Sequence, residues 1–376
     1  MPRVLTGLDI LVAEDFGPLR GRRLGLVTNH TAIDGQRRHI LDLFLDAGLD
    51  LAALFSPEHG FAGQVDERVG SATHEGTGLP IHSLYGEHEA PTPEMLAGTD
   101  LLVFDIADIG VRFYTYTTTM ALCMSAAAQS GIPFLVLDRP NPIRGDVVEG
   151  PVLDEPFRLL SSWHEVPLRH GLTVGELALW SNAEYNIGAD LDVLGCWGWT
   201  RDMWFDDTGL PWLNPSPNMR NLREAILYPA IGTLEACKLS VGRGTDTPFE
   251  VFGAPWIDDL ALAEALNAAG IAALRFVPVR FMPTSSKFAG EDCGGCYIML
   301  EDRAAFRPVD AAVEIARQLK NLGGDEFDHT AMHHLLGSRA AVEAIGNLEE
   351  TQSIMAAWQP GVEAYLQRRE AYLLYE

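Results

Sequence analysis

The stretch DLLVFDIADIGVRFYTYTTTMALCMSAAAQSGIPFLVLD, from Asp100 to Asp138, holds two short apolar runs on either side of a longer run of small and apolar residues. The runs Asp100–Asp105 and Ile132–Asp138 predict strands, and Thr117–Gly131 between them predicts a helix that ends at a glycine. Strands with nearly continuous apolar sequence are typical of a parallel sheet covered on both faces. The stretch therefore indicates a strand–helix–strand unit with parallel strands.

The same alternation begins nearer the N-terminus. Strands are predicted at Arg23–Thr28, 49–55 and Leu79–Gly86, with a helix at Arg37–Gly48 and a short helix at 93–98. Because parallel connections are right-handed, these elements predict an α/β fold with a Rossmann-like, doubly wound, mainly parallel sheet. Ligands of such sheets bind outside the carboxyl ends of the strands.

Beyond residue 150 the order of elements changes to that of an α+β domain. Helices are predicted near 173–186, 255–270 and 309–324, strands near 190–196, 274–283 and 294–302, and a C-terminal helix near 353–376 with a break at Pro360. A chain of 376 residues exceeds the roughly 250–300 residues over which one core grows efficiently. We therefore expect a Rossmann-like catalytic domain at 1–150 and a smaller α+β domain at 151–376, which closes a cleft between them.

The chain carries a formal net charge of −25, and three of its 27 basic residues are lysines. Such a chain repels nucleic acids and anionic membranes, so we expect no nucleic-acid partner. No apolar run reaches the ~18–20 residues of a membrane span, so we expect no membrane insertion. The N-terminal segment does not resemble a signal peptide, which favours a cytoplasmic location; removal of a leader would instead indicate a secreted or periplasmic one. The sequence makes no prediction of oligomeric state.

The five cysteines form no recognisable framework. Cys293 and Cys296 are the one close pair, in the sequence CGGC, and no second pair completes a zinc site. The pattern favours two cysteines that flank a Gly-Gly entry into a strand over a redox or metal motif. We therefore expect no metal.

Polar side chains follow four of the five predicted strands. They are Asn29 and His30 after the first strand, Glu58 and His59 after the second, Asp105, Asp108 and Arg112 after the fourth, and Arg139 and Asn141 after the fifth. Solvated turns would also be polar, but parallel strands bring all four loops to one edge of the sheet. The pattern therefore favours an active-site cleft at that edge.

Glu58 has two interpretations. It can complement the dipole of a neighbouring helix, or it can be a partly buried carboxylate suited to general acid–base work. Glycoside hydrolysis usually needs a second carboxylate, which Asp105 or Asp108 could supply unless its side chain only caps a turn.

Three further sequence patterns concern the kind of ligand that the protein binds. Arg243 lies between Gly242 and Gly244, either in a simple tight turn or as a cation held close to a ligand anion. The first strand is not followed by a glycine fingerprint and no Walker A motif is present, so we expect no nucleotide cofactor. Four tryptophans at 197–212 are either a core cluster or platforms for sugar rings.

Several long motifs resemble those of the NamZ-type exo-β-N-acetylmuramidases. In order, they are LGLVTNHT, LFSPEHGFAG, DLLVFDIADIGVRFYTYTTTM, VLDRPNPIRGDVVEGPVLD, HGLTVGELA, GLPWLNPSPNM and LSVGRGTDTPFEVFGAPW. The resemblance extends from about Leu24 to about Asp310. It implies a Rossmann-like domain and a smaller domain around an active cleft. It also implies release of terminal N-acetylmuramic acid from the non-reducing end of peptidoglycan fragments.

The resemblance also implies site residues. Glu58 is the leading acid/base candidate, with Asp105 and His59 as further catalytic candidates. The positions expected to bind substrate are Asn29, His30, Asp108, Arg112, Tyr114, Tyr116, Arg139, Asn141, Asn218, Glu235 and Arg243. N-acetylmuramic acid bears a carboxylate, for which an arginine offers a two-pronged partner. Arg112, Arg139 and Arg243 are the candidates for that contact.

The sequence departs from the family pattern in three places. Ala236, Cys237 and Lys238 follow Glu235 where the family usually has Gly-Thr-Asn, Ala107 replaces a glutamine, and Arg220 replaces a proline. These changes leave open a related N-acetylhexosamine as substrate, or a non-catalytic protein that binds muropeptides or amino sugars. A nucleotide-dependent enzyme is a weaker alternative, because the glycine fingerprint is missing.

Overall fold

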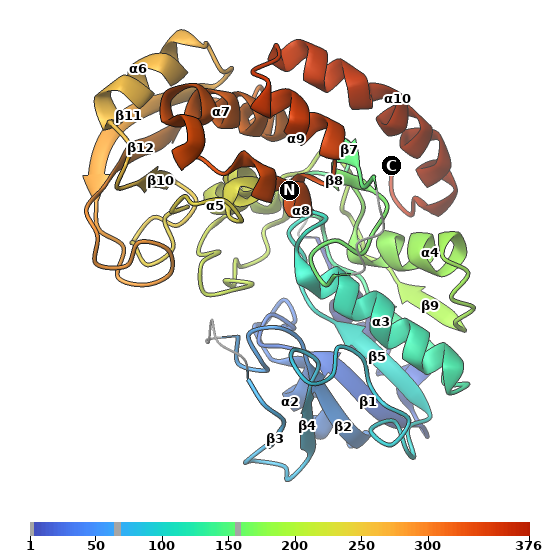
Figure 1. Cartoon of the computed structure of the whole chain (residues 1–376). Helices are drawn as coiled ribbons and strands as arrows, with labels where there is room; N and C mark the ends of the chain where they lie inside the picture. Colours follow the sequence, from blue (N-terminus) through green and yellow to red (C-terminus); the bar gives the residue numbers. More distant parts are fainter. Residues whose placement is uncertain (1–3, 64–68, 155–158) are drawn as a thin grey trace.

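The computed structural model describes residues 4–63, 69–154 and 159–376, and its largest element is a seven-stranded sheet (Figure 1). The strand order is β3-β4-β2-β1-β5-β6-β9. The bounds are β1 Arg23–Thr28, β2 Asp50–Ser56, β3 Ala72–Thr73, β4 Pro80–Ser83, β5 Leu101–Asp105, β6 Phe134–Leu137 and β9 Leu191–Leu194. All five predicted strands of the N-terminal part are confirmed.

The six longer strands are parallel, and β3 pairs with β4 in the antiparallel direction at one edge. From β1 the chain moves outward through β2 and β4, then returns to β5 beside β1 and moves the other way through β6 and β9. The order therefore reverses between β1 and β5. This is the doubly wound arrangement, and its ligand crevice lies at that reversal.

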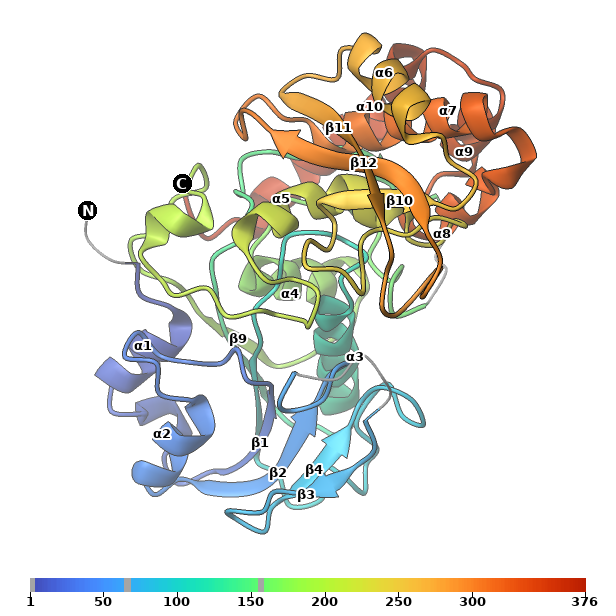
Figure 2. The same ribbon diagram turned by 90° about the vertical axis from the view of Figure 1, so that its left-hand side faces the viewer.

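Helices cover both faces of the sheet (Figure 2). Helices α1 (Gly7–Ala13) and α2 (Ile40–Asp46) pack on one face, and α3 (Thr115–Gln129) and α4 (Val174–Glu184) pack on the other. The N-cap of α4 is Thr173, whose side chain accepts from the backbone of Glu176. The Rossmann-like prediction is confirmed.

Alternate residues of each strand supply the two cores. In β1 and β5, Leu26 and Val103 pack with α1 and α2, whereas Val27 and Phe104 pack with α3 and α4. Each of these side chains is fully or almost fully buried, which stabilises the fold by roughly 1.5–3 kcal/mol per residue. Burial on both faces is the reason why these strands read as continuous apolar runs.

A second, three-stranded antiparallel sheet has the order β10-β12-β11. Its strands are β10 Val251–Ala254, β11 Leu274–Phe281 and β12 Cys293–Leu300, and it packs with α5 (Leu222–Ile231), α6 (Asp259–Ala268) and α7 (Pro308–Gly323). A Cβ on Gly295 would lie 2.0 Å from the carbonyl oxygen of Phe252, so the Gly-Gly pair permits close strand contact. Cys293 and Cys296 are buried free thiols, and no metal-ligating cluster occurs among the described residues.

The remaining elements surround these two sheets. They are strands β7 Glu149–Val152 and β8 Pro167–Arg169, helices α8 His333–Leu336, α9 Arg339–Gly346 and α10 Thr351–Arg369, and 3₁₀ turns at Gly17–Leu19, Phe205–Thr208, Gly232–Leu234, Gly324–Glu326, His329–Met332 and Glu370–Tyr372. Within the described ranges, no helix has the length and apolar character to cross a bilayer.

Two sequence predictions about helices are wrong. Residues 93–98 form successive turns, because so short a segment gains too few hydrogen bonds to offset helix nucleation. Helix α10 continues through Pro360 without a break. Pro360 is exposed, so water can bind the carbonyl one turn earlier that loses its amide partner.

The predicted domain boundary at residue 150 stays a prediction, but one strand from beyond it belongs to the large sheet of the N-terminal part. Strand β9 pairs with β6 along Phe134–Leu137, so residues from beyond 150 complete the large sheet. A strand of four half-buried residues carries little local information about which sheet it joins.

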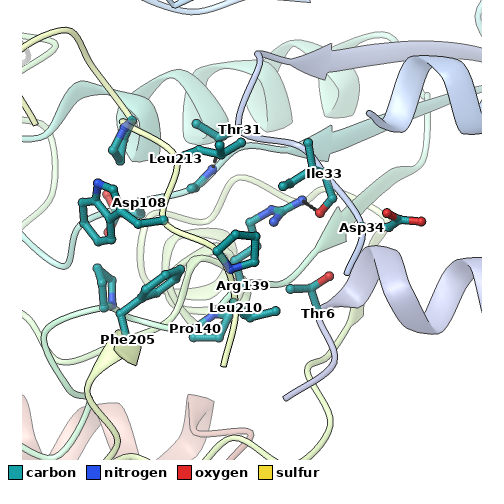
Figure 3. A pocket seen from close by; sticks show the side chains of 15 residues that line it. Thr6, Thr31, Ile33, Asp34, Asp108, Arg139, Pro140, Phe205, Leu210 and Leu213 are labelled. Atoms are coloured by element: carbon teal, nitrogen blue, oxygen red, sulfur yellow. Dashed lines mark hydrogen bonds between the residues drawn. The ribbon is translucent and has the colours of Figure 1, made fainter. Parts of the chain in front are cut away.

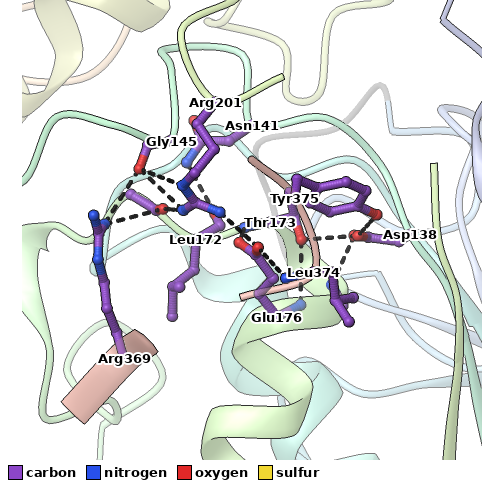
Figure 4. A network of polar contacts seen from close by, with 12 residues as sticks. Asp138, Asn141, Gly145, Leu172, Thr173, Glu176, Arg201, Arg369, Leu374 and Tyr375 are labelled. Atoms are coloured by element: carbon purple, nitrogen blue, oxygen red, sulfur yellow. Dashed lines mark hydrogen bonds and ion pairs between the residues drawn. The ribbon is translucent and has the colours of Figure 1, made fainter. Parts of the chain in front are cut away.

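The C-terminal tail returns to the large sheet through a buried polar network (Figure 4). The hydroxyl of Tyr375 donates to the carboxylate of Asp138, directly after β6, and the amide of Leu374 donates to Glu176 at 2.9 Å. Arg201 pairs with the same Glu176 carboxylate, and both Arg201 and Arg369 donate to the carbonyl of Gly145. The tail is therefore part of the structure that supports the carboxyl edge of β6.

Candidate active site

A cavity of about 280 Å³ lies where the carboxyl edge of the large sheet meets the smaller sheet and its helices. Both halves of the chain contribute side chains to it. The lining residues are Glu58, His59, Phe113, Tyr114, Thr115 and Tyr116 from the first half, and Ser161, Ser216, Met219, Tyr228, Glu235, Ala236, Arg243, Phe249 and Leu335 from the rest of the chain. The volume is close to the lower end of the roughly 300–1,000 Å³ typical of small-molecule sites.

Glu58 lies in the turn after β2, opposite the first turn of α3. The hydroxyl of Thr115, the first residue of α3, donates to Oε2 of Glu58 at 2.6 Å. His59 has a φ of 68°, and the amide of Gly60 closes the turn on the carbonyl of Pro57 at 3.0 Å. A tight turn and a helix terminus therefore fix the carboxylate of Glu58 at the cavity wall.

Three tyrosines form an aromatic wall. The ring centroids of Tyr114 and Tyr116 are 4.8 Å apart, and those of Tyr114 and Tyr228 are 6.2 Å apart. Burial raises the pKa of all three phenols, and the charge of Glu58 raises each of them further. The hydroxyls are therefore neutral, and that of Tyr116 donates to the carbonyl of Pro215 at 2.7 Å.

Arg243 is the arginine that lines this cavity. It pairs with the carboxylate of Glu235, and its guanidinium lies 5.6 Å from the ring centroid of Phe249. Gly244 has a φ of 78°, and a Cβ there would lie 2.5 Å from the amide nitrogen of Ser285. The glycine is thus needed for the close approach of two loops, and the tight turn presents a cation to the cavity.

A lysine fixes the loop that carries Glu235. The ammonium of Lys287 donates to the carbonyls of Glu235 and Cys237. Three of the five residues that depart from the family pattern, Ala236, Cys237 and Lys238, follow Glu235 in this loop, and Ala236 lines the cavity. The altered segment therefore contributes directly to the cavity wall.

The structure brings six of the fourteen predicted site residues to this cavity. They are Glu58, His59, Tyr114, Tyr116, Glu235 and Arg243. Glu58 and His59 come from the turn after β2, Tyr114 and Tyr116 from the start of α3, and Glu235 and Arg243 from the second half of the chain. The remaining eight lie in its surroundings.

Asp105 does not line the cavity. It is 0% exposed and forms a two-pronged ion pair with Arg139, in which Nη2 of Arg139 lies 2.9 Å from Oδ2 of Asp105. Such a buried pair is expensive to break, because the remaining charge would lack a partner. The position of Asp105 supports a structural role in place of the predicted catalytic one.

Arg112 does not line the cavity either. It is 1% exposed, and its terminal nitrogens donate to the backbone carbonyls of Pro151, Val166, Leu335 and Leu336 at 2.7–3.0 Å. These carbonyls come from three separate segments of the chain. Arg112 thus holds those segments together, and its terminal nitrogens are not directed at a ligand.

The predicted amides and His30 also serve the local structure. Oδ1 of Asn29 accepts from the backbone and hydroxyl of Thr31, and Nδ2 of Asn141 donates to the carbonyl of Leu172 at 2.9 Å. Nε2 of His30 lies 2.8 Å from the carbonyl oxygen of Asn214, and burial lowers the pKa of this histidine. These contacts position the loops that surround the cavity.

Asn218 is also predicted to bind substrate. It is buried and lines a separate, open depression with the turn that follows Arg243.

A second, smaller pocket of about 50 Å³ has Pro215 among its lining residues (Figure 3). Asp108 and Arg139 line it, together with mainly apolar groups such as Trp212 and Phe205. Oδ2 of Asp108 accepts from the amide of Gly110 at 2.8 Å. The pocket has room for a few water molecules but not for a sugar ring.

The tryptophan segment is mainly structural. Trp199 and Trp204 are buried, at 3% and 7% exposure, and Trp212 lines the smaller pocket. Trp197 is 57% exposed, and none of the four lines the larger cavity, so the core interpretation holds for Trp199 and Trp204.

Sequence reasoning missed several lining residues. Thr115 stands two residues before the predicted helix, near the position where a threonine is a common N-cap. Tyr228 lies inside α5, and Leu335 belongs to the short helix α8. No local pattern marks such residues, because only the packing of the second half of the chain against the sheet edge brings them to the cavity.

Comparison with known proteins identifies the family. Residues 24–223 match the model of the N-terminal part of exo-beta-N-acetylmuramidase NamZ, and residues 226–375 match that of its C-terminal part. The chain is 40% identical over 380 residues to the peptidoglycan beta-N-acetylmuramidase NamZ of Bacillus subtilis (strain 168), covering 100% of this chain and 92% of that protein.

Two crystal structures of DUF1343 family proteins from Bacteroides fragilis NCTC 9343 have the same fold. One is 33% identical with a TM-score of 0.91, and the other is 30% identical with a TM-score of 0.82. In both cases the match covers 100% of this chain and 99% of the other. Together with the two family matches, these similarities show that the chain belongs to the exo-beta-N-acetylmuramidase NamZ family.

Proposed function

We propose that the protein is a glycoside hydrolase that releases terminal β-linked N-acetylmuramic acid from the non-reducing end of peptidoglycan fragments. The name of the Bacillus subtilis relative supports this activity, and so does membership of the family. One observation carries the proposal: the carboxylate of Glu58 is fixed at the wall of a cavity that also holds an arginine and an aromatic surface.

Glu58 is the general acid of the proposed reaction. Its carboxyl group donates a proton to the glycosidic oxygen as the bond to the anomeric carbon breaks. The neutral hydroxyls of Tyr114 and Tyr116 and the ring of Phe249 border the same space, so a sugar ring there has both apolar and hydrogen-bonding partners.

Arg243 binds the lactyl carboxylate in this proposal. Of the three arginines considered from the sequence, Arg112 donates to backbone carbonyls and Arg139 pairs with Asp105, whereas Arg243 lines the cavity. A guanidinium can bind two carboxylates at once through different N–H groups, so its pair with Glu235 is compatible with ligand binding.

The test is hydrolysis of a chromogenic β-N-acetylmuramide beside the matching β-N-acetylglucosaminide. The wild-type protein is expected to cleave the first, and Glu58→Gln is expected to lose at least ~10²-fold of the rate while it retains the native fold. Cleavage of the glucosaminide alone would instead indicate an enzyme for a related N-acetylhexosamine. Tight sugar binding without turnover by the wild type would indicate a non-catalytic binding protein.

A further inference from the structure

We propose that Glu235 is the second carboxylate of the reaction and takes the proton of the attacking water. The assignment rests on the proposed glycosidase function. For this role sequence reasoning left open Asp105 or Asp108, and neither of them lines the cavity.

Glu235 and Asp105 differ in the accessibility of their side chains. The side chain of Glu235 is 28% exposed and lines the cavity together with Glu58, whereas that of Asp105 is 0% exposed and lies beneath Arg139. A group that acts on substrate must reach it, and Glu235 meets this condition where Asp105 does not. The geometry therefore places two accessible carboxylates in one cavity.

Glu235 is also held in place. Its backbone follows the 3₁₀ turn Gly232–Leu234, its carbonyl accepts from the ammonium of Lys287, and its carboxylate pairs with Arg243. A carboxylate engaged with a guanidinium is an anion, which suits it to accept a proton and to stabilise positive charge at the anomeric carbon. Thr115 donates to Oε2 of Glu58, so the other oxygen, Oε1, can carry the proton that the general acid transfers.

Tyr228 belongs to the same cavity wall as Glu58 and Glu235. It lines the cavity with both of them, and its pKa is raised by burial and then by the charges of Glu235 and Glu58. One phenol therefore lies within electrostatic reach of both carboxylates. The two acids thus line one cavity, as a pair that acts on one glycosidic bond must.

In the proposed reaction one proton leaves Glu58 and another passes to Glu235. Glu58 transfers its proton to the glycosidic oxygen, the bond from that oxygen to the anomeric carbon breaks, and the aglycone leaves as an alcohol. Water forms the new bond to the anomeric carbon, and its proton passes to Glu235. Proton exchange with solvent then restores a protonated Glu58 and an ionised Glu235, so the cycle consumes one water.

The experiment compares Glu235→Ala and wild type on an activated β-N-acetylmuramide, with and without sodium azide. We expect kcat of Glu235→Ala to fall about 10³-fold, and azide, an anion that needs no base, to restore part of the rate as a glycosyl azide. Glu264→Ala, at an exposed position on α6, is the matched control and is expected to keep the wild-type rate without azide product.

Two outcomes would overturn the assignment. A Glu235→Ala variant that keeps kcat and only raises KM would mean that Glu235 merely orients Arg243. Loss of kcat in a folded variant without any azide product would likewise remove Glu235 from the water-activating role. Absence of turnover by the wild type would instead contradict the proposed function itself, so the two failures are distinguishable.

Discussion

The hydroxyl of Thr115 donates a 2.6 Å hydrogen bond to Oε2 of Glu58, which joins the first residue of α3 to the turn after β2. The two residues are 57 positions apart in the chain. Parallel strand order brings them together, because β2 and β5 lie on either side of β1 and all three end at the same edge. The contact orients the carboxylate that we propose as the general acid.

Removal of this hydroxyl is expected to impair catalysis. Thr115→Val should lower kcat by up to about 10-fold, since a hydrogen bond between neutral groups contributes about 0.5–1.5 kcal/mol and this one orients the protonated Glu58. Thr115→Ser keeps the hydroxyl and should retain most of the activity. The measurements are kcat across pH and the unfolding midpoint of each variant.

Thr119→Val is the control for Thr115. This hydroxyl also lies on α3, where it donates to the carbonyl of Thr115 at 3.3 Å, and it does not line the cavity. If Thr115→Val matched wild type in both rate and pH profile, the contact would have no part in positioning Glu58.

Substitution of Arg243 is expected to alter substrate preference. Arg243→Lys keeps the positive charge but loses the planar fork, and should reduce kcat/KM on the β-N-acetylmuramide about 10- to 100-fold. Any rate on the β-N-acetylglucosaminide, which has no carboxylate, should fall far less. The measurement is the ratio of kcat/KM for the two substrates.

Arg220→Lys provides a matched comparison for Arg243. Arg220 is exposed outside the cavity, where it donates to the carbonyl of Asp246 at 3.1 Å, so its replacement should leave the ratio unchanged. If Arg243→Lys lowered kcat/KM equally for both substrates, the guanidinium would not bind the lactyl carboxylate of the substrate.

Replacement of Arg112 is expected to affect stability. Arg112→Met leaves four buried backbone carbonyls without this donor, and each costs about 1–3 kcal/mol when it lacks a partner. The free energy of unfolding in urea should therefore fall by at least ~3 kcal/mol. A stable variant with a raised KM would instead support the ligand-binding role that the sequence suggested.

Asp138 is expected to make stability depend on pH. Burial raises its pKa from 3.8 to about 6, although it accepts from Tyr375 and Thr173. Between these two values the folded protein keeps a proton that the unfolded chain releases, so stability falls as pH rises from about 4 to about 6. Two pKa units correspond to about 3 kcal/mol.

The comparison that isolates this effect uses Asp138→Asn, which does not titrate. The stability of wild type relative to the variant should decrease between pH 4 and pH 7, as measured by urea unfolding at each pH. Parallel curves for the two proteins would mean that Asp138 has the same proton affinity in the folded and unfolded states.

Much of the fold could be predicted from local sequence. The strands at Arg23–Thr28 and Leu101–Asp105 are apolar on both faces, and this alone indicates a parallel sheet covered by helices. Chain order then places Glu58 and His59 at the carboxyl edge, where the structure has them. The break at Pro360 was wrong because local sequence does not reveal whether a helix position faces solvent.

Which polar residue serves the ligand and which serves the fold was decided by tertiary structure. Asp105 ends a strand and Glu235 follows a 3₁₀ turn, and nothing in their neighbouring sequence shows that one is buried in a pair with Arg139 and the other accessible beside Arg243. Apolar periodicity is a local property that a strand or helix records in its own residues. Accessibility and charge pairing depend on how separate segments pack: the Asp105–Arg139 pair joins residues 34 positions apart, and the cavity that Glu235 lines is built from both halves of the chain.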